Sequence, residues 1–383
     1  MVHVPSFRLC PDLCEVVAVA SRSKEKASAF AAEWGIPRVH GDWQSLLAIP
    51  DIDGVVICPP SGLTGSMAQA AVARGKHVLC EKPLGLTYPE AQSVEAAAEN
   101  QAAVHMVAFT YRFVPALRYL KQLLLEGRFG EIRHFRLCCF SDRMLDPTAP
   151  IVWRNRRVQA GAGVLADMGS HAIDLGRYLL GEFRAVSGVT RLYVRERPMQ
   201  NSRGFEPVDA DDGCAFTAEF SNGAIGSFDL NRAVAGRGGS GRAVYHSIEI
   251  HGTGGAAVYE LIHPLELMIS LGPAMTRRQH WARVEVPLDL MCFPDSPRNP
   301  RLDDPLFGYK LDQGVAFLHA ICGTTKDYPT FHDGAEAQRV VGALEQAFGA
   351  RRWVEPQLAH RACISREMSR ARHRLARLSE CGS

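Results

Sequence analysis

The chain has 383 residues, of which 46% are hydrophobic and 22% charged, and its formal net charge is +2 at pH 7. This length predicts two domains with substantial cores, and the composition is that of an ordinary globular protein. The balanced charge and the lack of any apolar run of about twenty residues exclude nucleic acid and membranes as the main partner, so we expect a cytoplasmic protein.

The first part of the chain, residues 1–109, alternates short apolar strands with helices. Thr87 followed by Glu90 forms a capping box, and Gly75 suits the end of the helix before it. Short buried strands that alternate with helices predict an α/β fold with a doubly wound parallel sheet. The predicted strands are 15–20, 53–58, 76–80 and 103–109, and the predicted helices are 24–34, 67–74 and 87–100.

The second part, residues 110–355, has longer strands, and Asn222-Gly223 between two of them indicates a hairpin. We therefore predict an α+β domain with a mostly antiparallel open sheet. Residues 356–383 carry six arginines against two glutamates and predict a solvated basic tail rather than a nucleic-acid site. The predicted strands are 132–141, 186–194, 214–220, 224–231, 247–251 and 256–261, and the predicted helices are 115–126, 164–180 and 335–349.

The eleven cysteines do not form a metal-binding pattern. No Cys-x-x-Cys pair occurs, and Cys10 with Cys14 lacks a second pair of ligands. Free thiols in a reducing compartment are the simpler interpretation, so no metal is predicted.

A dinucleotide site in a doubly wound sheet is normally built on the first strand and a glycine-rich turn. The sequence opens at a point that resembles the inside of the first helix, without that strand or turn. Either the natural start lies upstream, which we favour, or cofactor binding has been lost. The Gly-x-Gly-x-x-Gly of residues 236–241 has no helix after it and predicts a loop.

The strand at 76–80 runs directly into Glu81-Lys82-Pro83. A lysine at the carboxyl end of a buried parallel strand points into the crevice where such sheets hold their ligands. There Lys82 can hold a substrate hydroxyl and favour its ionised form, although a solvated lysine is the plain alternative.

Asp167, His171 and Asp174 are spaced four and then three residues apart, which places them on one stripe of a helix. A polar stripe on a mostly apolar helix is costly unless it is used. Histidine exchanges protons near neutral pH, so the stripe predicts a general acid–base site, with a structural histidine as the alternative. Gly161 and Gly163 allow a close backbone approach that a ligand pocket or a turn would use.

Four more residues are predicted to border the same crevice: Tyr111, Arg112, Trp153 and Arg154. The strand at 15–20 ends in Ser21-Arg22, where NAD-binding proteins carry an acidic residue for the ribose. Arginine suits a 2′-phosphate, so NADP is predicted over NAD.

These motifs, in this order and spacing, make the chain similar to the glucose–fructose oxidoreductase / inositol dehydrogenase family (Gfo/Idh/MocA). The similarity runs from about residue 3 to residue 354. The matching segments are 75–83 (Gly-Lys-His-Val-Leu-Cys-Glu-Lys-Pro), 111–116 (Tyr-Arg-Phe-x-Pro-Ala), 161–174, 222–226 (Asn-Gly-Ala-Ile-Gly) and 329–334 (Pro-Thr-Phe-x-Asp-Gly).

The resemblance implies a Rossmann domain followed by an α/β domain whose sheet pairs subunits in a homo-oligomer. It implies that His171 exchanges the proton, that Asp167 orients His171, and that Lys82 polarises the reacting oxygen. It also implies that Pro59, Pro60 and Ser61 lie by the nicotinamide. From their positions in the chain, Glu81 and Lys82 are predicted to contact the cofactor as well. The residues predicted to contact the substrate are Tyr111, Arg112, Trp153, Arg154 and Asp174. Thr64 departs from the pattern, since the family often has histidine there.

The function predicted from the resemblance is NAD(P)-dependent hydride transfer at a hydroxyl-bearing carbon of a sugar, a sugar derivative or a cyclitol. One alternative is a non-catalytic regulatory or scaffold relic that has lost the cofactor. A second is a lyase that uses tightly held NAD through a transient oxidation.

Overall fold

The computed structural model of the chain describes residues 2–200, 202–236, 244–272 and 280–356. The predicted basic tail at 356–383 lies outside the described residues except for its first position, and so does the predicted loop at 236–241. Within the described residues, no helix is both long and apolar enough to cross a membrane.

The first part of the chain forms parallel strands flanked by helices, as predicted, but the strands fall into two groups. Two of them, β1 and β2, pair with each other, and β3, β4 and β5 form a second group in that order. Within the described residues β1 and β3 are not paired. The elements are α1 (His3–Arg8), β1 (Ala18–Ala20), α2 (Lys24–Trp34), β2 (Arg38–His40), α3 (Trp43–Leu47), β3 (Gly54–Ile57), α4 (Thr64–Val72), β4 (His77–Cys80), α5 (Tyr88–Ala98) and β5 (His105–Val107).

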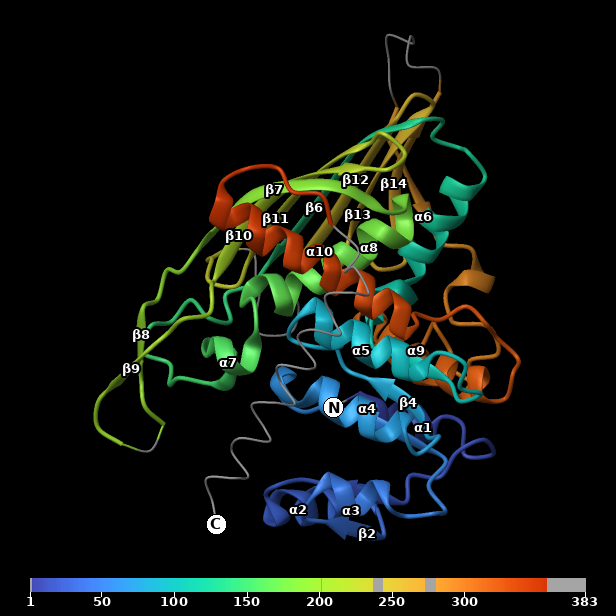
Figure 1. Cartoon of the computed structure of the whole chain (residues 1–383). Coiled ribbons are helices and arrows are strands. Elements are labelled where there is room, and N and C mark those ends of the chain that lie inside the picture. The colour runs from blue at the N-terminus through green and yellow to red at the C-terminus, as the bar shows by residue number, and fades with distance from the viewer. Residues whose placement is uncertain (1, 201, 237–243, 273–279, 357–383) are drawn as a thin grey trace.

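The second part is built on one eight-stranded sheet in the order β15-β14-β13-β12-β6-β11-β10-β7, antiparallel except for the β6–β11 pair. Figure 1 shows α8 and α10 lying across one face of this sheet. On that sheet, Phe216 and Phe228 stack with ring centroids 4.3 Å apart, which joins β10 to β11 in the core. The strands are β6 (Ile132–Phe140), β7 (Phe183–Arg191), β10 (Gly213–Phe220), β11 (Ile225–Asn231), β12 (Tyr245–Gly252), β13 (Gly255–Glu260), β14 (Glu266–Leu271) and β15 (Ala282–Glu285).

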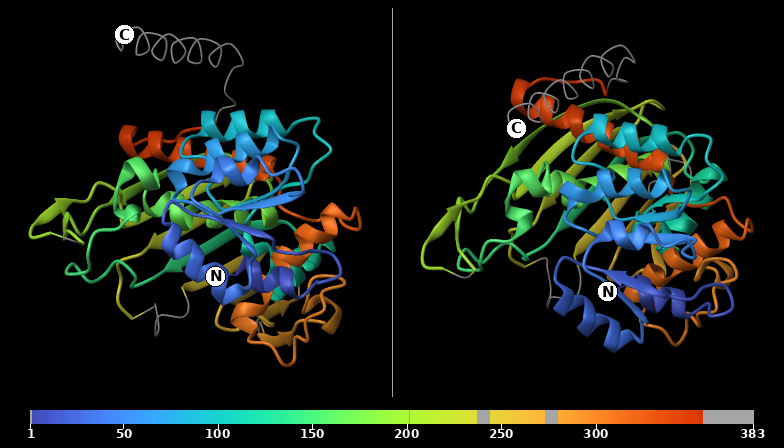
Figure 2. Two further views of the ribbon diagram at one scale, coloured as in Figure 1. Left: turned by 90° about the horizontal axis from the view of Figure 1, so that it is seen from below. Right: turned by 60° about the horizontal axis from the view of Figure 1, so that its bottom comes forward.

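The helices of the second part are α6 (Pro115–Leu125), α7 (Arg157–Ala160), α8 (Ser170–Leu180), α9 (Pro305–Ile321) and α10 (Phe331–Ala350). The helix predicted at 164–180 is a π-helical turn over Leu165–Gly169 that continues into α8. Several elements were not predicted: the helices α3, α7 and α9, the strands β2, β14 and β15, and a small hairpin. That hairpin, β8 (Glu196–Pro198) with β9 (Phe205–Pro207), projects from the body of the molecule in Figures 1 and 2.

The last two helices return to the first part of the chain. The helix α9 packs against α1, and α10 packs against α5. The backbone N–H of Val107, in β5, donates to the Pro329 carbonyl at 2.9 Å. Elements from both ends of the chain thus pack together, and the division into two domains between residues 109 and 110 stays a prediction.

Candidate active site

The ammonium group of Lys82 lies against Asp167, as predicted. Lys82 follows β4, and its Nζ donates to the Asp167 Oδ1 at 3.0 Å and to the Asp167 carbonyl at 2.5 Å. Asp167 lies in the π-helical turn before α8, and such turns are frequent at functional sites. The carboxyl edge of the parallel strands therefore meets the start of α8 through this ion pair.

Gly163 fixes where that turn begins. Its φ is +57°, and an added Cβ would lie 2.5 Å from the Asp211 backbone nitrogen. The N–H of Val164 donates to the Asp211 carbonyl at 2.9 Å. The close approach that the sequence suggested is thus made by the protein's own backbone, which anchors the segment carrying Asp167.

The Asp167 carboxylate is held in its ionised form. Burial by itself would raise the pKa of Asp167, but the charges of Lys82 and Arg154 outweigh burial and hold it well below its usual range. The Arg154 Nε lies 3.5 Å from the other carboxylate oxygen. Asp167 is therefore a fixed negative charge between two cations at neutral pH.

His171 lies one turn further along, in α8, against the ring of Tyr111 at 4.8 Å. Burial, followed by the Lys82 charge, lowers the pKa of His171 well below its ordinary value, although Asp167 opposes the shift. Its Nδ1 is buried without a hydrogen-bond partner. The imidazole is therefore neutral at pH 7. Within the described residues no hydrogen bond joins His171 to Asp167. Asp167 therefore acts on His171 through its charge and not through the predicted orienting contact.

Two cavities meet at this set of residues. His171 lines a cavity of about 410 Å³, whereas Lys82 and Asp167 line a second cavity of about 370 Å³, and Glu81 lines both. The His3 ring lies 3.2 Å from the Glu81 carboxylate. Glu81 is therefore the residue at which the two cavities adjoin.

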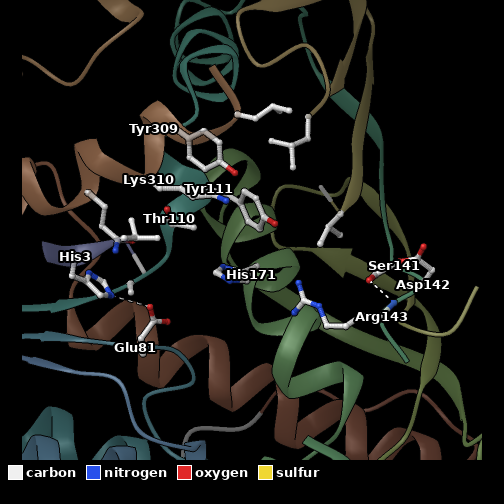
Figure 3. A pocket seen from close by; sticks show the side chains of 16 residues that line it. His3, Glu81, Thr110, Tyr111, Ser141, Asp142, Arg143, His171, Tyr309 and Lys310 are labelled. Atoms are coloured by element: carbon white, nitrogen blue, oxygen red, sulfur yellow. Dashed lines mark hydrogen bonds and ion pairs between the residues drawn. The ribbon is translucent and has the colours of Figure 1, made fainter. Parts of the chain in front are cut away.

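The larger cavity is lined by polar side chains that the structure leaves without partners (Figure 3). Besides His171 Nδ1, the Thr110 Oγ1 and the Gln313 Oε1 are buried and have no hydrogen bond within the described residues. Buried polar atoms of this kind are usually satisfied in proteins, so they suit a ligand rich in hydroxyl groups. The sequence analysis identified Tyr111 in this cavity but missed Thr110, Arg143, Tyr309, Lys310 and Gln313.

The smaller cavity collects most of the residues predicted for the cofactor. Pro59, Pro60 and Ser61 come from the loop after β3, and Glu81 and Lys82 come from the loop after β4. Trp153 and Arg154 line the same cavity, with the Arg154 guanidinium over the Trp153 ring at 4.3 Å. Ser21 and Arg22 follow β1 and line neither cavity. Among the described residues, no group of three or more His, Cys, Asp or Glu side chains could hold a metal ion.

Arg112 and Asp174 do not border the crevice, contrary to the prediction. Arg112 Nε and Nη2 donate to the two oxygens of Asp174 at 2.9 and 2.5 Å, and Nη2 also donates to Asp333 at 2.8 Å. Asp174 is only 1% exposed, and burial raises its pKa to about 6 although Arg112 opposes the shift. Neither residue lines the two cavities, because the pair is used to join the end of the first part to α8 and α10.

His246 is a second buried imidazole beside the site, and its protonation should make stability depend on pH. Burial lowers the pKa of His246 to about 3, and neither ring nitrogen has a partner within the described residues. In the unfolded chain His246 takes up a proton near pH 6.5, whereas in the folded chain it stays neutral down to about pH 3. The contribution of neutral His246 to the free energy of unfolding is therefore fully present above pH 6.5 and is lost as the pH falls towards 3. Between pH 7 and pH 5, the free energy of unfolding measured with urea should fall by roughly 2 kcal/mol less for His246→Phe than for the native chain. Equal losses would contradict the assignment.

Two family descriptions match the chain. Residues 2–109 match the "Oxidoreductase family, NAD-binding Rossmann fold", and residues 117–258 match the "GFO/IDH/MocA C-terminal domain". Levoglucosan dehydrogenase from Pseudarthrobacter phenanthrenivorans is 34% identical over 363 residues, which cover 89% of this chain and 90% of that protein. Inositol 2-dehydrogenase from Rhizobium meliloti is 28% identical over 68% of this chain and 73% of its own length.

A solved structure extends the match to three dimensions. The chain superposes on levoglucosan dehydrogenase in complex with NADH and levoglucosan with a TM-score of 0.84. The match has 31% sequence identity and covers 93% of this chain and 96% of that one. It includes both parts of the fold and the junction between them.

Proposed function

The chain belongs to the Gfo/Idh/MocA family of oxidoreductases, and from this premise we propose that it transfers a hydride at a hydroxyl-bearing carbon of a sugar, a sugar derivative or a cyclitol. The observation that carries the proposal is the junction of the two cavities, where the Lys82–Asp167 ion pair lies beside the neutral imidazole of His171. Relatives with the same fold are named as sugar and cyclitol dehydrogenases.

The chemistry of the site follows from the charges. In the oxidising direction His171 accepts the proton of the substrate hydroxyl as the carbon–hydrogen bond breaks, and the hydroxyl carbon becomes a carbonyl. The Lys82 ammonium group stabilises the negative charge that builds on the substrate oxygen. Asp167 is ionised, so it compensates the charge of Lys82. It also fixes the position of Lys82, because its carboxylate and its backbone carbonyl each accept a hydrogen bond from the ammonium group. The reverse sequence reduces the carbonyl.

The residues present fit a nicotinamide cofactor on one side of the junction. Loops that follow parallel strands are where such folds hold dinucleotides, and the loops after β3 and β4 line the smaller cavity. Pro59, Pro60, Ser61, Glu81 and Lys82 would hold the cofactor in this cavity. When bound, the cofactor takes the hydride that leaves the substrate carbon and thereby balances the oxidation.

We propose that the chain prefers NADP over NAD because Arg22 binds the 2′-phosphate of NADP. Its side chain is exposed at the end of β1, and no carboxylate precedes α2 to bind a ribose hydroxyl. Arg22→Ala should raise the KM for NADP about tenfold and leave the KM for NAD within about twofold, since one charge-assisted contact is lost. Steady-state kinetics with both cofactors measures the ratio; a ratio unchanged by Arg22→Ala would contradict the preference.

The comparisons do not support the alternative of a non-catalytic relic.

The direct test of the proposed function follows nicotinamide reduction at its absorbance maximum with both cofactors and a panel of neutral sugars, sugar acids and cyclitols. Lys82→Met is the negative control, because it removes the ammonium group from the reacting oxygen. A panel with no reduction by the native chain, or equal rates for the native chain and Lys82→Met, would overturn the proposal.

A further inference from the structure

Two basic side chains from distant parts of the chain line the larger cavity together with His171. Arg143 comes from the segment after β6, and Lys310 comes from the second turn of α9. Figure 3 shows the Arg143 side chain reaching into the cavity with its guanidinium group on the side of the His171 ring. The side chains that line this cavity therefore include two positively charged groups as well as the base, His171.

Neither cation has a carboxylate partner, which distinguishes them from the other basic residues around the site. Arg154 pairs with Asp167, and Arg232 pairs with Asp212 at 3.2 Å. In the described part of the chain, the Arg143 guanidinium makes no hydrogen bond or ion pair, and the Lys310 ammonium group contacts only aromatic rings, with Tyr309 at 5.7 Å. Two unneutralised cations facing one cavity are a site for an anion.

The charge of Arg143 is felt inside the cavity. Burial raises the pKa of Tyr111, and the Arg143 charge opposes that shift. Burial also lowers the pKa of the Lys310 ammonium group; the Asp304 charge opposes this effect and the Arg143 charge adds to it. The Arg143 charge therefore acts unfavourably on the Lys310 ammonium group, and an anionic group between them would relieve that repulsion.

The acidic residues that line this cavity do not supply the missing counter-charge. The Glu81 carboxylate contacts His3 at 3.2 Å, and within the described residues it forms no ion pair with Arg143 or Lys310. Asp142 is exposed beside Arg143, and no ion pair joins the two.

We propose that the substrate is an acidic sugar, whose carboxylate or phosphate group is bound by Arg143 and Lys310 while its reacting carbon lies at His171. The inference rests on the proposed function and adds the substrate class. A volume of about 410 Å³ suits a ligand of monosaccharide size. The unpartnered atoms of Thr110 and Gln313 would bind hydroxyl groups between the two ends of the ligand.

The test compares D-glucose, D-glucuronate and D-glucose 6-phosphate, each also in its galacto form, as substrates of the full chain and as ligands in calorimetric titration. The native chain should have a higher kcat/KM, or a tighter Kd, for one acidic form than for its neutral counterpart. Arg143→Gln should lower that value about 10- to 100-fold and change the value for neutral sugars less than threefold, since a charge-assisted contact is lost. Lys310→Gln should act in the same direction.

Arg133→Gln is the matched control, because Arg133 is exposed in β6, has no ion-pair partner within the described residues and lines neither cavity. Three results would overturn the inference: neutral sugars preferred by the native chain, no acidic or neutral sugar bound, or an Arg143→Gln effect that falls on the KM of the nicotinamide cofactor with every sugar. The last result would assign the cations to the cofactor diphosphate. If nicotinamide reduction is absent with every substrate while acidic sugars still bind through Arg143, the proposed function fails and this inference stands.

Discussion

Replacing His171 with asparagine should lower kcat about 10²- to 10⁴-fold, because the site loses the imidazole that is proposed to take up the hydroxyl proton. Asparagine keeps a polar side chain of similar size but cannot take up the hydroxyl proton. Cofactor binding should be preserved, since the residues that line the smaller cavity are unchanged. Single-turnover kinetics measures the proton and hydride step, and nicotinamide fluorescence titration measures the cofactor Kd.

His280→Asn provides the control for this prediction, because His280 is exposed and lines neither cavity. It should leave both quantities unchanged. The role given to His171 would be wrong if His171→Asn kept more than about a tenth of the native kcat. It would also be wrong if the loss appeared entirely as weaker cofactor binding.

The second large effect is expected in stability, on replacing Arg112 with methionine. Arg112 makes hydrogen bonds to two carboxylates, Asp174 and Asp333, and Asp333 also accepts a bond from Arg177 at 3.3 Å. Removing one partner of a buried ion pair leaves the other charge without compensation, which typically costs about 3–5 kcal/mol. Urea denaturation should show a loss of this size in the free energy of unfolding.

Two further variants sharpen the test of Arg112. Arg112→Met combined with Asp174→Asn should recover part of the loss, because the uncompensated carboxylate is then neutral. Arg38→Met breaks a solvent-exposed pair with Asp51 and should change the free energy of unfolding little. A native-like urea midpoint for Arg112→Met would contradict the assignment of this network as structural.

The parts of the site that the sequence predicted are those carried by local pattern. A strand that ends in a lysine and a helix with a polar stripe each follow from spacing along the chain, and the structure brings Lys82 and Asp167 to 3.0 Å. The pattern could not tell which polar residues of the stripe face the site. His171 and Asp174 both lie in α8, but Asp174 pairs with Arg112 and lines neither cavity.

The residues that the sequence missed are brought to the site by tertiary contacts alone. Lys310 and Gln313 lie on α9, and no helix was predicted there because glycines interrupt its apolar pattern at positions 308 and 314. Asp304 before Pro305 is a start signal that could have located this helix, since the Asp304 carboxylate accepts from the Leu306 N–H at 2.9 Å. Arg143 lies in an irregular segment, for which periodicity gives no information.

The backbone bond from Val107 to Pro329 and the packing of α10 on α5 have a consequence for how the polypeptide is made. The outer strand β5 of the first sheet has its open edge covered by residues more than two hundred positions further on. During synthesis this edge and the side of α5 that packs on α10 stay uncovered until Pro329 and α10 have left the ribosome. Residues 1–109 therefore lack part of their packing during that interval, which exposes a strand edge to other nascent chains.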